Sequence, residues 1–235
     1  MSSRTRMTRL VKGLLWADIE NDVRHDPAIL DVRDSRGRNW LHHACSVNVG
    51  KRNLKPSASI RTVDVLLDAG LDINEAAFTE GDWKATPLWF AVAFGDNVRL
   101  AKHLLERGSD PRFCLWAAVN RDNAAAIRLL LRSGSDDPTN DEGSPLLAAI
   151  DWNRPAAADA LVRLGADVNF QDLHGTTPLH CALRKRRDKA YIRLLIDHGA
   201  RGDLKDASGT TAVDMMMRRR DPEMRQWARD LSASS

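Results

Sequence analysis

The stretch "DLHGTTPLHCAL" at residues 172–183, followed by "YIRLLIDHGA" at 191–200, decides the fold. Thr177 is a favourable helix N-cap, and Pro178 stands at the first helical position, where a missing N–H is tolerated. An apolar stripe with a small alanine follows, which allows close helix packing. The second segment carries a leucine and isoleucine run and ends at Gly199, a residue suited to the left-handed C-terminal cap. The two segments therefore predict a short helix, a turn and a second helix.

The same two-block pattern recurs along the chain. The first block has an apolar residue in its third place and, in most copies, an alanine in its sixth. Its copies are "NWLHHAC" (39–45), "TPLWFAV" (86–92), "FCLWAAV" (113–119), "SPLLAAI" (144–150), "TPLHCAL" (177–183) and "TAVDMMM" (211–217). The second block closes on a glycine at Gly70, Gly108, Gly134, Gly165 and Gly199. A period of about 33 residues predicts stacked repeats, because one short helix pair cannot bury its apolar face alone.

Three segments carry a family resemblance: "DLHGTTPLHCAL…YIRLLIDHGA" (172–200), "KATPLWFAVAFGD" (84–96) and "RLGADVNFQD" (163–172). On these segments the chain resembles the ankyrin repeat family over about residues 34–217. The resemblance implies an all-α solenoid of about five to six stacked helix-turn-helix repeats plus caps, with hairpin-like loops and a concave groove. It also implies a non-catalytic module that binds a protein or peptide partner through that groove and its loops.

The repeat pattern predicts the domain organisation. Residues 1–33 are expected to form N-terminal capping helices, residues 34–205 the repeats, and residues 206–235 a C-terminal capping repeat with a short tail. The predicted repeat boundaries are 34–74, 75–110, 111–137, 138–171 and 172–205. The first repeat carries an insertion at 46–60 between its helices, and the loop before Thr86 is lengthened.

The composition is that of an ordinary globular chain, with 43% hydrophobic and 29% charged residues and a net charge of +3. Three irregularly spaced cysteines argue against a disulfide framework and for a reducing compartment. The apolar patch near the start is too short and too polar for a secretory signal, and no stretch is long enough to span a membrane. These features predict a cytoplasmic protein that makes no membrane contact. The sequence leaves the oligomeric state open, with a monomer favoured.

A possible metal site is the group His42, His43 and Cys45, because imidazole and thiolate are the usual ligands of zinc. However, His42 stands in the same repeat position as His180, where the family histidine bonds to the turn and to the neighbouring repeat. The other cysteines lie in different repeats, and the chain carries no nucleophile, phosphate-loop or zinc-protease motif. The sequence thus predicts no enzyme, no cofactor and no metal site.

Two basic runs, "RKRRDK" at 184–189 and "RRR" at 218–220, and the Lys51–Lys55 insertion offer an alternative function. Such runs can bind a polyanion or nucleic acid. Acidic residues dilute both runs, and no aromatic platform accompanies them in the sequence. A solvated charged edge is therefore the favoured interpretation, and nucleic acid is not the favoured partner.

Aromatic residues give the strongest functional signal, because seven tryptophans stand against one tyrosine and tryptophan is enriched at binding hot spots. The family resemblance implies that several of the variable helix positions face the groove. The candidate partner-binding residues are Trp83, Phe90, Phe94, Arg121, Trp152, Lys185 and His43. The alternative is that these aromatic side chains only fill space between repeats.

Overall fold

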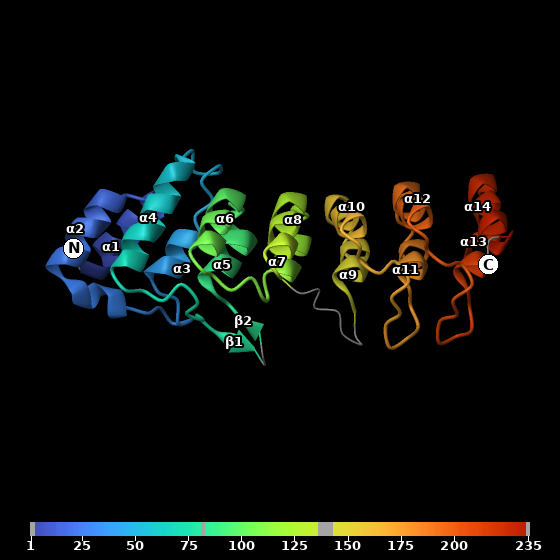
Figure 1. Ribbon diagram of the computed structural model, residues 1–235, viewed down its shortest axis with the longest axis horizontal. Helices are drawn as coiled ribbons and strands as arrows, with labels where there is room; N and C mark the ends of the chain where they lie inside the picture. Colours follow the sequence, from blue (N-terminus) through green and yellow to red (C-terminus); the bar gives the residue numbers. More distant parts are fainter. Residues whose placement is uncertain (1–2, 81–82, 136–142, 234–235) are drawn as a thin grey trace. The chain divides into compact units, whose positions relative to one another are not determined.

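The computed structural model describes residues 3–80, 83–135 and 143–233 of the chain, and these residues are mostly helical (Figure 1). The chain divides into two compact units. Unit 1 comprises residues 1–117 and 129–135, and unit 2 comprises residues 118–128 and 136–235. The repeat boundaries given above stay a prediction.

Unit 1 is built from short helices and one small hairpin. Its elements are α1 (Ser3–Gly13), α2 (Trp16–His25), the 3-10 helix η1 (Pro27–Asp31), α3 (Trp40–Cys45), α4 (Pro56–Asp68), β1 (Thr79–Glu80), β2 (Trp83–Lys84), α5 (Pro87–Phe90), the π-helix η2 (Ala91–Gly95) and α6 (Val98–Glu106). The helices form an inner row in which α1 packs on α3 and α3 packs on α5. They also form an outer row in which α2 packs on α4 and α4 packs on α6. Buried leucines such as Leu41, Leu66, Leu88 and Leu100 fill the space within the unit.

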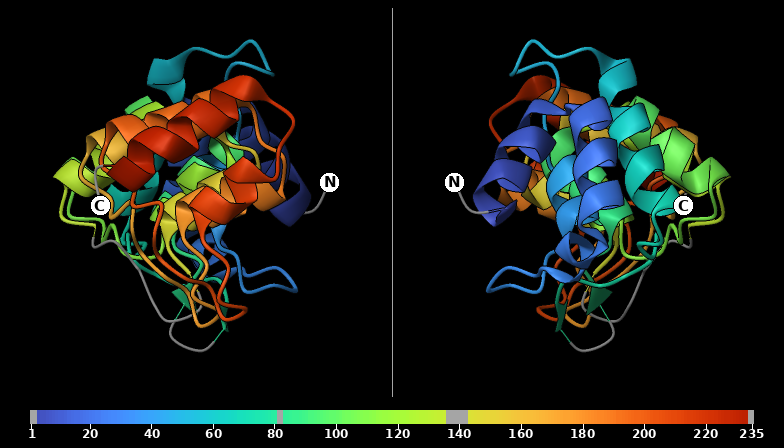
Figure 2. Two further views of the ribbon diagram at one scale, coloured as in Figure 1. Left: turned by 90° about the vertical axis from the view of Figure 1, so that its right-hand side faces the viewer. Right: turned by 90° about the vertical axis from the view of Figure 1, so that its left-hand side faces the viewer.

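Unit 2 repeats this arrangement. Two helices, α7 (Leu115–Asn120) and α8 (Ala124–Arg132), contribute residues to both units. The others are α9 (Pro145–Asp151), α10 (Pro155–Arg163), α11 (Pro178–Arg184), α12 (Lys189–Asp197), α13 (Ala212–Met217) and α14 (Pro222–Ala233). Helix α11 packs between α9 and α13, and α10 packs on α12. The pair α13 and α14 covers one end of the unit and faces the viewer in Figure 2, left.

The first helix of a pair begins at a side-chain cap, as the motif predicts. Thr177 Oγ1 accepts a hydrogen bond from His180 N, and Asn39 Oδ1 accepts one from His42 N in the same way. Caps of this kind each stabilise a helix by about 1 kcal/mol. The histidines also reach the next loop, with His42 Nε2 2.9 Å from Glu75 O and His180 Nε2 3.2 Å from Thr210 O. The turn-bracing role expected for both histidines is thus confirmed.

A close approach between α3 and the π-helix η2 requires a glycine at position 95. A Cβ atom on Gly95 would lie 2.4 Å from the carbonyl oxygen of Cys45 in α3. We expect Gly95→Ala to lower the free energy of unfolding by about 1–3 kcal/mol, the usual cost of overpacking. Urea unfolding of the purified chain measures this loss, and Gly108→Ala is an informative comparison. Its Cβ would meet nothing within 4 Å, so only the strain of its positive φ applies there. A Gly95→Ala variant as stable as the wild type would contradict the close packing.

Candidate functional site

Five aromatic rings gather in unit 1, and we call them the aromatic cluster: Phe78, Trp83, Trp89, Phe90 and Phe94. The ring centroids of Trp83 and Trp89 are 5.0 Å apart, and those of Trp89 and Phe90 are 5.1 Å apart. Phe94 stacks on Phe90 at 5.7 Å, and Phe78 meets Trp83 at 5.4 Å. Aromatic pairs in these tilted, edge-on and stacked geometries attract each other by about 0.5–1.5 kcal/mol beyond their buried area. The cluster is thus a cohesive surface whose shape is largely fixed.

The members of the aromatic cluster differ sharply in exposure. Phe94 is 55% exposed and Phe78 is 40% exposed, while Trp83 and Trp89 are half-buried. Phe90 is only 2% exposed, so the expectation that it lies on the groove surface is wrong. It is the buried member of the cluster, and its ring meets the imidazole of His42 at 5.4 Å and the ring of Phe78 at 6.5 Å. Phe90 therefore supports the exposed rings.

Two local structures hold the exposed rings. The hairpin pairs β1 with β2, with Glu80 opposite Trp83. Its base is closed by hydrogen bonds from Ala77 N to Ala85 O and from Ala85 N to Phe78 O, both 3.0 Å long. The π-helix η2 ends the inner helix with a wider turn than an α-helix and carries Phe94. Main-chain hydrogen bonds and ring contacts thus together fix the positions of Phe78, Trp83 and Phe94.

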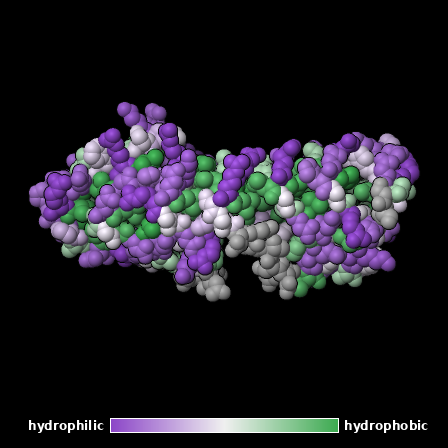
Figure 3. All heavy atoms as spheres, in the orientation of Figure 1, coloured by the Kyte–Doolittle hydropathy of each residue, from purple (hydrophilic) through white to green (hydrophobic). Residues whose placement is uncertain are grey.

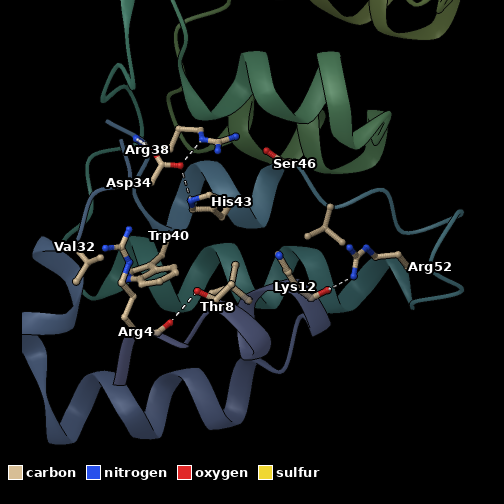
Figure 4. A pocket seen from close by; sticks show the side chains of 12 residues that line it. Arg4, Thr8, Lys12, Val32, Asp34, Arg38, Trp40, His43, Ser46 and Arg52 are labelled. Carbon is tan, nitrogen blue, oxygen red and sulfur yellow. Dashed lines mark hydrogen bonds and ion pairs between the residues drawn. The ribbon is translucent and has the colours of Figure 1, made fainter. Parts of the chain in front are cut away.

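His43 lies elsewhere on the inner row of unit 1, in the wall of a pocket between α1 and α3 (Figure 4). Its Nε2 is 3.3 Å from Asp34 Oδ2, and its ring centroid is 6.0 Å from that of Trp40. Burial lowers the pKa of His43 below its usual value, and the nearby Arg38 acts in the same direction. The imidazole is therefore neutral at pH 7.

The remaining candidate residues belong to unit 2. Trp152 follows α9 and is 39% exposed, and Lys185 follows α11. Lys185 Nζ forms an ion pair with Asp151 Oδ1 at 2.5 Å, and Asp151 directly precedes Trp152 in the sequence. Arg121 is exposed just after α7. The structure thus brings Trp83, Phe90 and Phe94 together in unit 1 and pairs Lys185 with Asp151 in unit 2.

The basic run at 184–189 is largely engaged within the protein. Arg184 pairs with Asp206, and Arg187 donates to the carbonyl oxygens of Ile150 and Asp151. Lys189 Nζ lies 2.6 Å from a carboxylate oxygen of Asp221 and 2.7 Å from one of Glu223. Arg219, in the second run, donates to Leu183 O at 2.6 Å. These side chains link neighbouring helix pairs and leave only part of the charge for a polyanion.

The described side chains form no metal site, and the buried cysteines are not reactive thiols. Within residues 3–80, 83–135 and 143–233, no group of three or more His, Cys, Asp and Glu side chains is placed to hold a metal ion. All three cysteines are free thiols and buried. Burial raises the pKa of Cys114 to about 12 and that of Cys181 to about 11, so neither thiol is a nucleophile at pH 7. No helix in these residues is long and apolar enough to cross a membrane.

The predicted partner-binding residues did not include two members of the aromatic cluster, Phe78 and the half-buried Trp89. Phe78 belongs to the lengthened loop before Thr86, so loop length was the available signal. It also missed Arg38, whose guanidinium carbon lies 6.0 Å from the centre of the Phe90 ring and so joins the aromatic cluster to the His43 pocket. No pattern in the sequence indicates that contact, because the two residues lie in different repeats.

Comparison with known proteins identifies the family. Ankyrin repeat models match residues 88–172, as three copies, and residues 174–207, together more than half of the chain. The chain is 29% identical over 189 residues to the Homo sapiens transient receptor potential cation channel subfamily A member 1, a match that covers 79% of this chain and 14% of that protein. It is 34% identical over 109 residues to Mus musculus Rabankyrin-5, a match that covers 39% of this chain and 9% of that protein. The matches thus span only a small part of the curated relatives.

Solved structures agree on the fold. The human ASB11 ankyrin repeat domain superposes with a TM-score of 0.73 at 21% identity and covers 96% of both chains. The ankyrin repeat domain of Bcl-3 superposes with a TM-score of 0.72 at 23% identity, covering 95% of this chain and 97% of that one. Both structures are under 25% identical to this chain, so they show the fold alone. The chain belongs to the ankyrin repeat family and has its all-α fold of stacked helix pairs.

Proposed function

We propose that this chain is a non-catalytic interaction module that binds a protein or peptide partner through the aromatic cluster of unit 1. Ankyrin repeats are in general protein–protein interaction modules, and the fold is typically non-catalytic. The observation that carries the proposal is the exposure of Phe94 and Phe78 around a buried Phe90. Connected aromatic side chains that stay exposed on a folded domain usually mark an interaction site.

The mechanism follows from the stiffness of the support. Phe94 is held by the π-helix and Trp83 by the hairpin, so little conformational entropy is lost when a partner docks. The exposed rings offer an apolar surface of fixed shape, and the Arg38 guanidinium lies 6.0 Å from the Phe90 ring of the same cluster. Figure 3 shows hydrophilic residues over much of the visible face of the part that holds α1 to α6, with hydrophobic residues between them. Apolar anchor residues within a largely hydrophilic surface are typical of protein interaction sites.

The proposal also covers secondary contacts in unit 2 and the cellular compartment. Trp152 and Lys185 are exposed in unit 2 and are proposed as secondary contacts with the same partner, together with Arg121. The proposed setting is the cytoplasm, because three free, buried cysteines suit a reducing compartment. The alternative, polyanion binding by the basic runs, is not preferred, because Arg184, Arg187 and Lys189 are engaged within unit 2.

Replacing Phe94 with alanine is expected to weaken partner binding at least tenfold, about 1.4 kcal/mol, while the chain stays folded and loses only the stability of two ring contacts. The reason is that Phe94 is 55% exposed, so its ring contributes more to a partner interface than to the core. A peptide-display library selected against the full chain supplies binders, and fluorescence polarisation measures their affinity for each variant. Trp83→Ala is expected to act in the same direction.

The matched control is Leu173→Ala, which removes another exposed apolar side chain, 67% exposed, from a loop of unit 2. It should leave both affinity and thermal stability unchanged. Selected peptides that bind Phe94→Ala and Trp83→Ala as tightly as the wild type would show that the aromatic cluster is not the docking surface.

A further inference from the structure

A cavity of about 280 Å³ opens between α1 and α3 in unit 1, and we call it the cationic pocket. Its wall combines the apolar side chains of Trp40 and Val47 with basic side chains from three segments. Figure 4 shows Arg4 and Lys12 coming from α1, with His43 and Trp40 coming from α3. Trp40 is fixed by a hydrogen bond from its Nε1 to Ile29 O of 2.7 Å. The pocket is therefore a shaped cavity with a rigid apolar wall.

Three cations of the cationic pocket have no carboxylate partner in the part of the chain that the structure describes. Among the described residues, no Asp or Glu oxygen lies within 4.0 Å of the charged groups of Arg4, Lys12 or Arg52, whereas ion pairs are common elsewhere in the chain. Helix α1 itself shows the contrast. Arg6, on the side that faces α2, pairs with Asp22 at 2.6 Å, while Arg4 and Lys12 face the pocket unpaired.

The carboxylate in the wall does not neutralise this charge. Asp34 accepts hydrogen bonds from the backbone N–H groups of Arg36 and Arg38 and pairs with the Arg38 guanidinium at 2.7 Å. Its pKa is lowered by these hydrogen bonds against the opposing effect of burial, so it stays ionised. Arg4, Lys12, Arg38 and Arg52 against one carboxylate leave an excess of three positive charges around the cavity. Like charges held this close favour an anion that carries more than one negative charge.

The insertion of the first repeat supplies one of these cations. Arg52 lies in the segment between α3 and α4, and its Nη1 donates to Lys12 O at the end of α1, at 3.4 Å. This contact ties the insertion to α1 and brings the guanidinium to the rim of the cationic pocket. Without the insertion, the pocket would lose that side of its wall.

The cationic pocket and the aromatic cluster are neighbours. Arg38 pairs with Asp34 in the pocket wall, and its guanidinium carbon lies 6.0 Å from the ring centre of Phe90, the buried member of the cluster. Both features lie on the inner row of unit 1, one at α1 and α3 and the other at α5. One extended segment could therefore place an apolar side chain on the cluster and an anionic side chain in the pocket.

We propose that the cationic pocket binds a phosphorylated side chain of the partner segment that docks on the aromatic cluster. This inference takes the partner segment from the proposed function. The pocket itself is observed independently of that proposal. A phosphate group carries about −1.5 to −2 charges at pH 7 and three acceptor oxygens, which suits two guanidinium groups and an ammonium group. A carboxylate side chain carries only one charge and would leave most of the excess uncompensated.

The test is an NMR titration of the ¹⁵N-labelled full chain with O-phosphoserine, at constant ionic strength set by sodium chloride. We expect saturable shifts of the amides of Thr8, Lys12, His43 and Ser46. The variant Arg4→Gln/Lys12→Gln/Arg52→Gln should weaken this binding at least tenfold, because it removes the unpaired cations. Serine itself should produce no saturable shift.

A matched variant, Arg24→Gln/Arg99→Gln/Lys102→Gln, removes the same charge from exposed positions away from the pocket and should bind O-phosphoserine like the wild type. Equal losses in both variants, or the absence of saturable shifts in the wild type, would overturn the proposal. A single-stranded oligonucleotide that shifts the pocket amides at lower concentration than O-phosphoserine would also overturn it, in favour of nucleic acid. Thermal melting confirms that both variants are folded.

The experiments distinguish failure of the pocket proposal from failure of the docking proposal for the aromatic cluster. Phe94→Ala should keep O-phosphoserine binding, because its ring is not part of the cationic pocket. Selected peptides that bind the cluster while O-phosphoserine does not bind the pocket would overturn the pocket and leave the proposed function standing. O-phosphoserine binding without any dependence of peptide affinity on Phe94 or Trp83 would refute the docking surface and show that the pocket binds phosphate independently of it.

Discussion

Replacing Phe90 with alanine is expected to destabilise the chain by about 3–5 kcal/mol, the usual cost of truncating a buried phenylalanine. The side chain is 2% exposed and contacts the rings of His42, Phe94 and Phe78. Its removal leaves a cavity between α3 and α5 that these neighbours only partly fill. The stability of repeat proteins depends on contacts between adjacent helix pairs, so a cavity at such a contact destabilises both pairs.

The matched control is Phe94→Ala, since it removes the same side chain from a neighbouring position. With its ring 55% exposed, Phe94 should cost only about 1–2 kcal/mol, chiefly its ring contacts with Phe90 and Trp89. Urea unfolding followed by circular dichroism gives both values under one set of conditions. Equal losses for the two variants would mean that Phe90 and Phe94 are packed alike, which contradicts their burial.

The fold was predictable because its signals are local. Thr177 and Pro178 specify a helix start within two residues, and Gly199 specifies an end. Repetition of these signals along the chain then implies stacking, because each pair has one apolar face and no core of its own. The histidine contacts were predictable for the same reason, since His42 and His180 follow from position in the repeat.

Exposure in the aromatic cluster was not predictable in the same way. The repeat position of Phe90 indicated a groove residue, yet the hairpin places Phe78 beside its ring, and Arg38 approaches from the previous loop. The π-helix after α5 also changes the direction of Phe94 relative to an α-helical register. Such changes depend on contacts between segments far apart in sequence, which motif spacing does not encode.

The cationic pocket was likewise not predictable from the spacing of motifs in the sequence. His43 was predicted as a partner contact from its variable position, and that role stays a prediction. The charges around it come from α1, the loop before α3 and the insertion, so they converge only in three dimensions. Read in the sequence, Arg4, Lys12 and Arg52 are scattered basic residues in a chain with a net charge of only +3.

Lowering the pH is expected to destabilise unit 1 through His42. Burial lowers the pKa of this histidine from 6.5 to about 4, against the raising effect of the hydrogen bond to Glu75 O. In the unfolded chain the imidazole regains its usual pKa and binds a proton below pH 6.5, while the folded protein excludes that proton. The stabilisation is thus fully present above pH 6.5 and is lost as the pH falls from 6.5 toward 4, by about 3 kcal/mol in total.

Urea unfolding at pH 7 and at pH 4 measures this loss, and His42→Gln removes it, because glutamine does not titrate. The variant is expected to be less stable at pH 7, since it alters the bracing contact to Glu75, but its stability should fall by about 3 kcal/mol less on acidification. His180, whose pKa burial also lowers, adds a loss of the same sign that persists in this variant. His174→Gln, at an exposed position, should keep the wild-type difference between the two pH values. If His42→Gln and the wild type lost equal stability, the buried imidazole would have to be protonated in the folded state, and its contact with Glu75 O would then be a charged hydrogen bond.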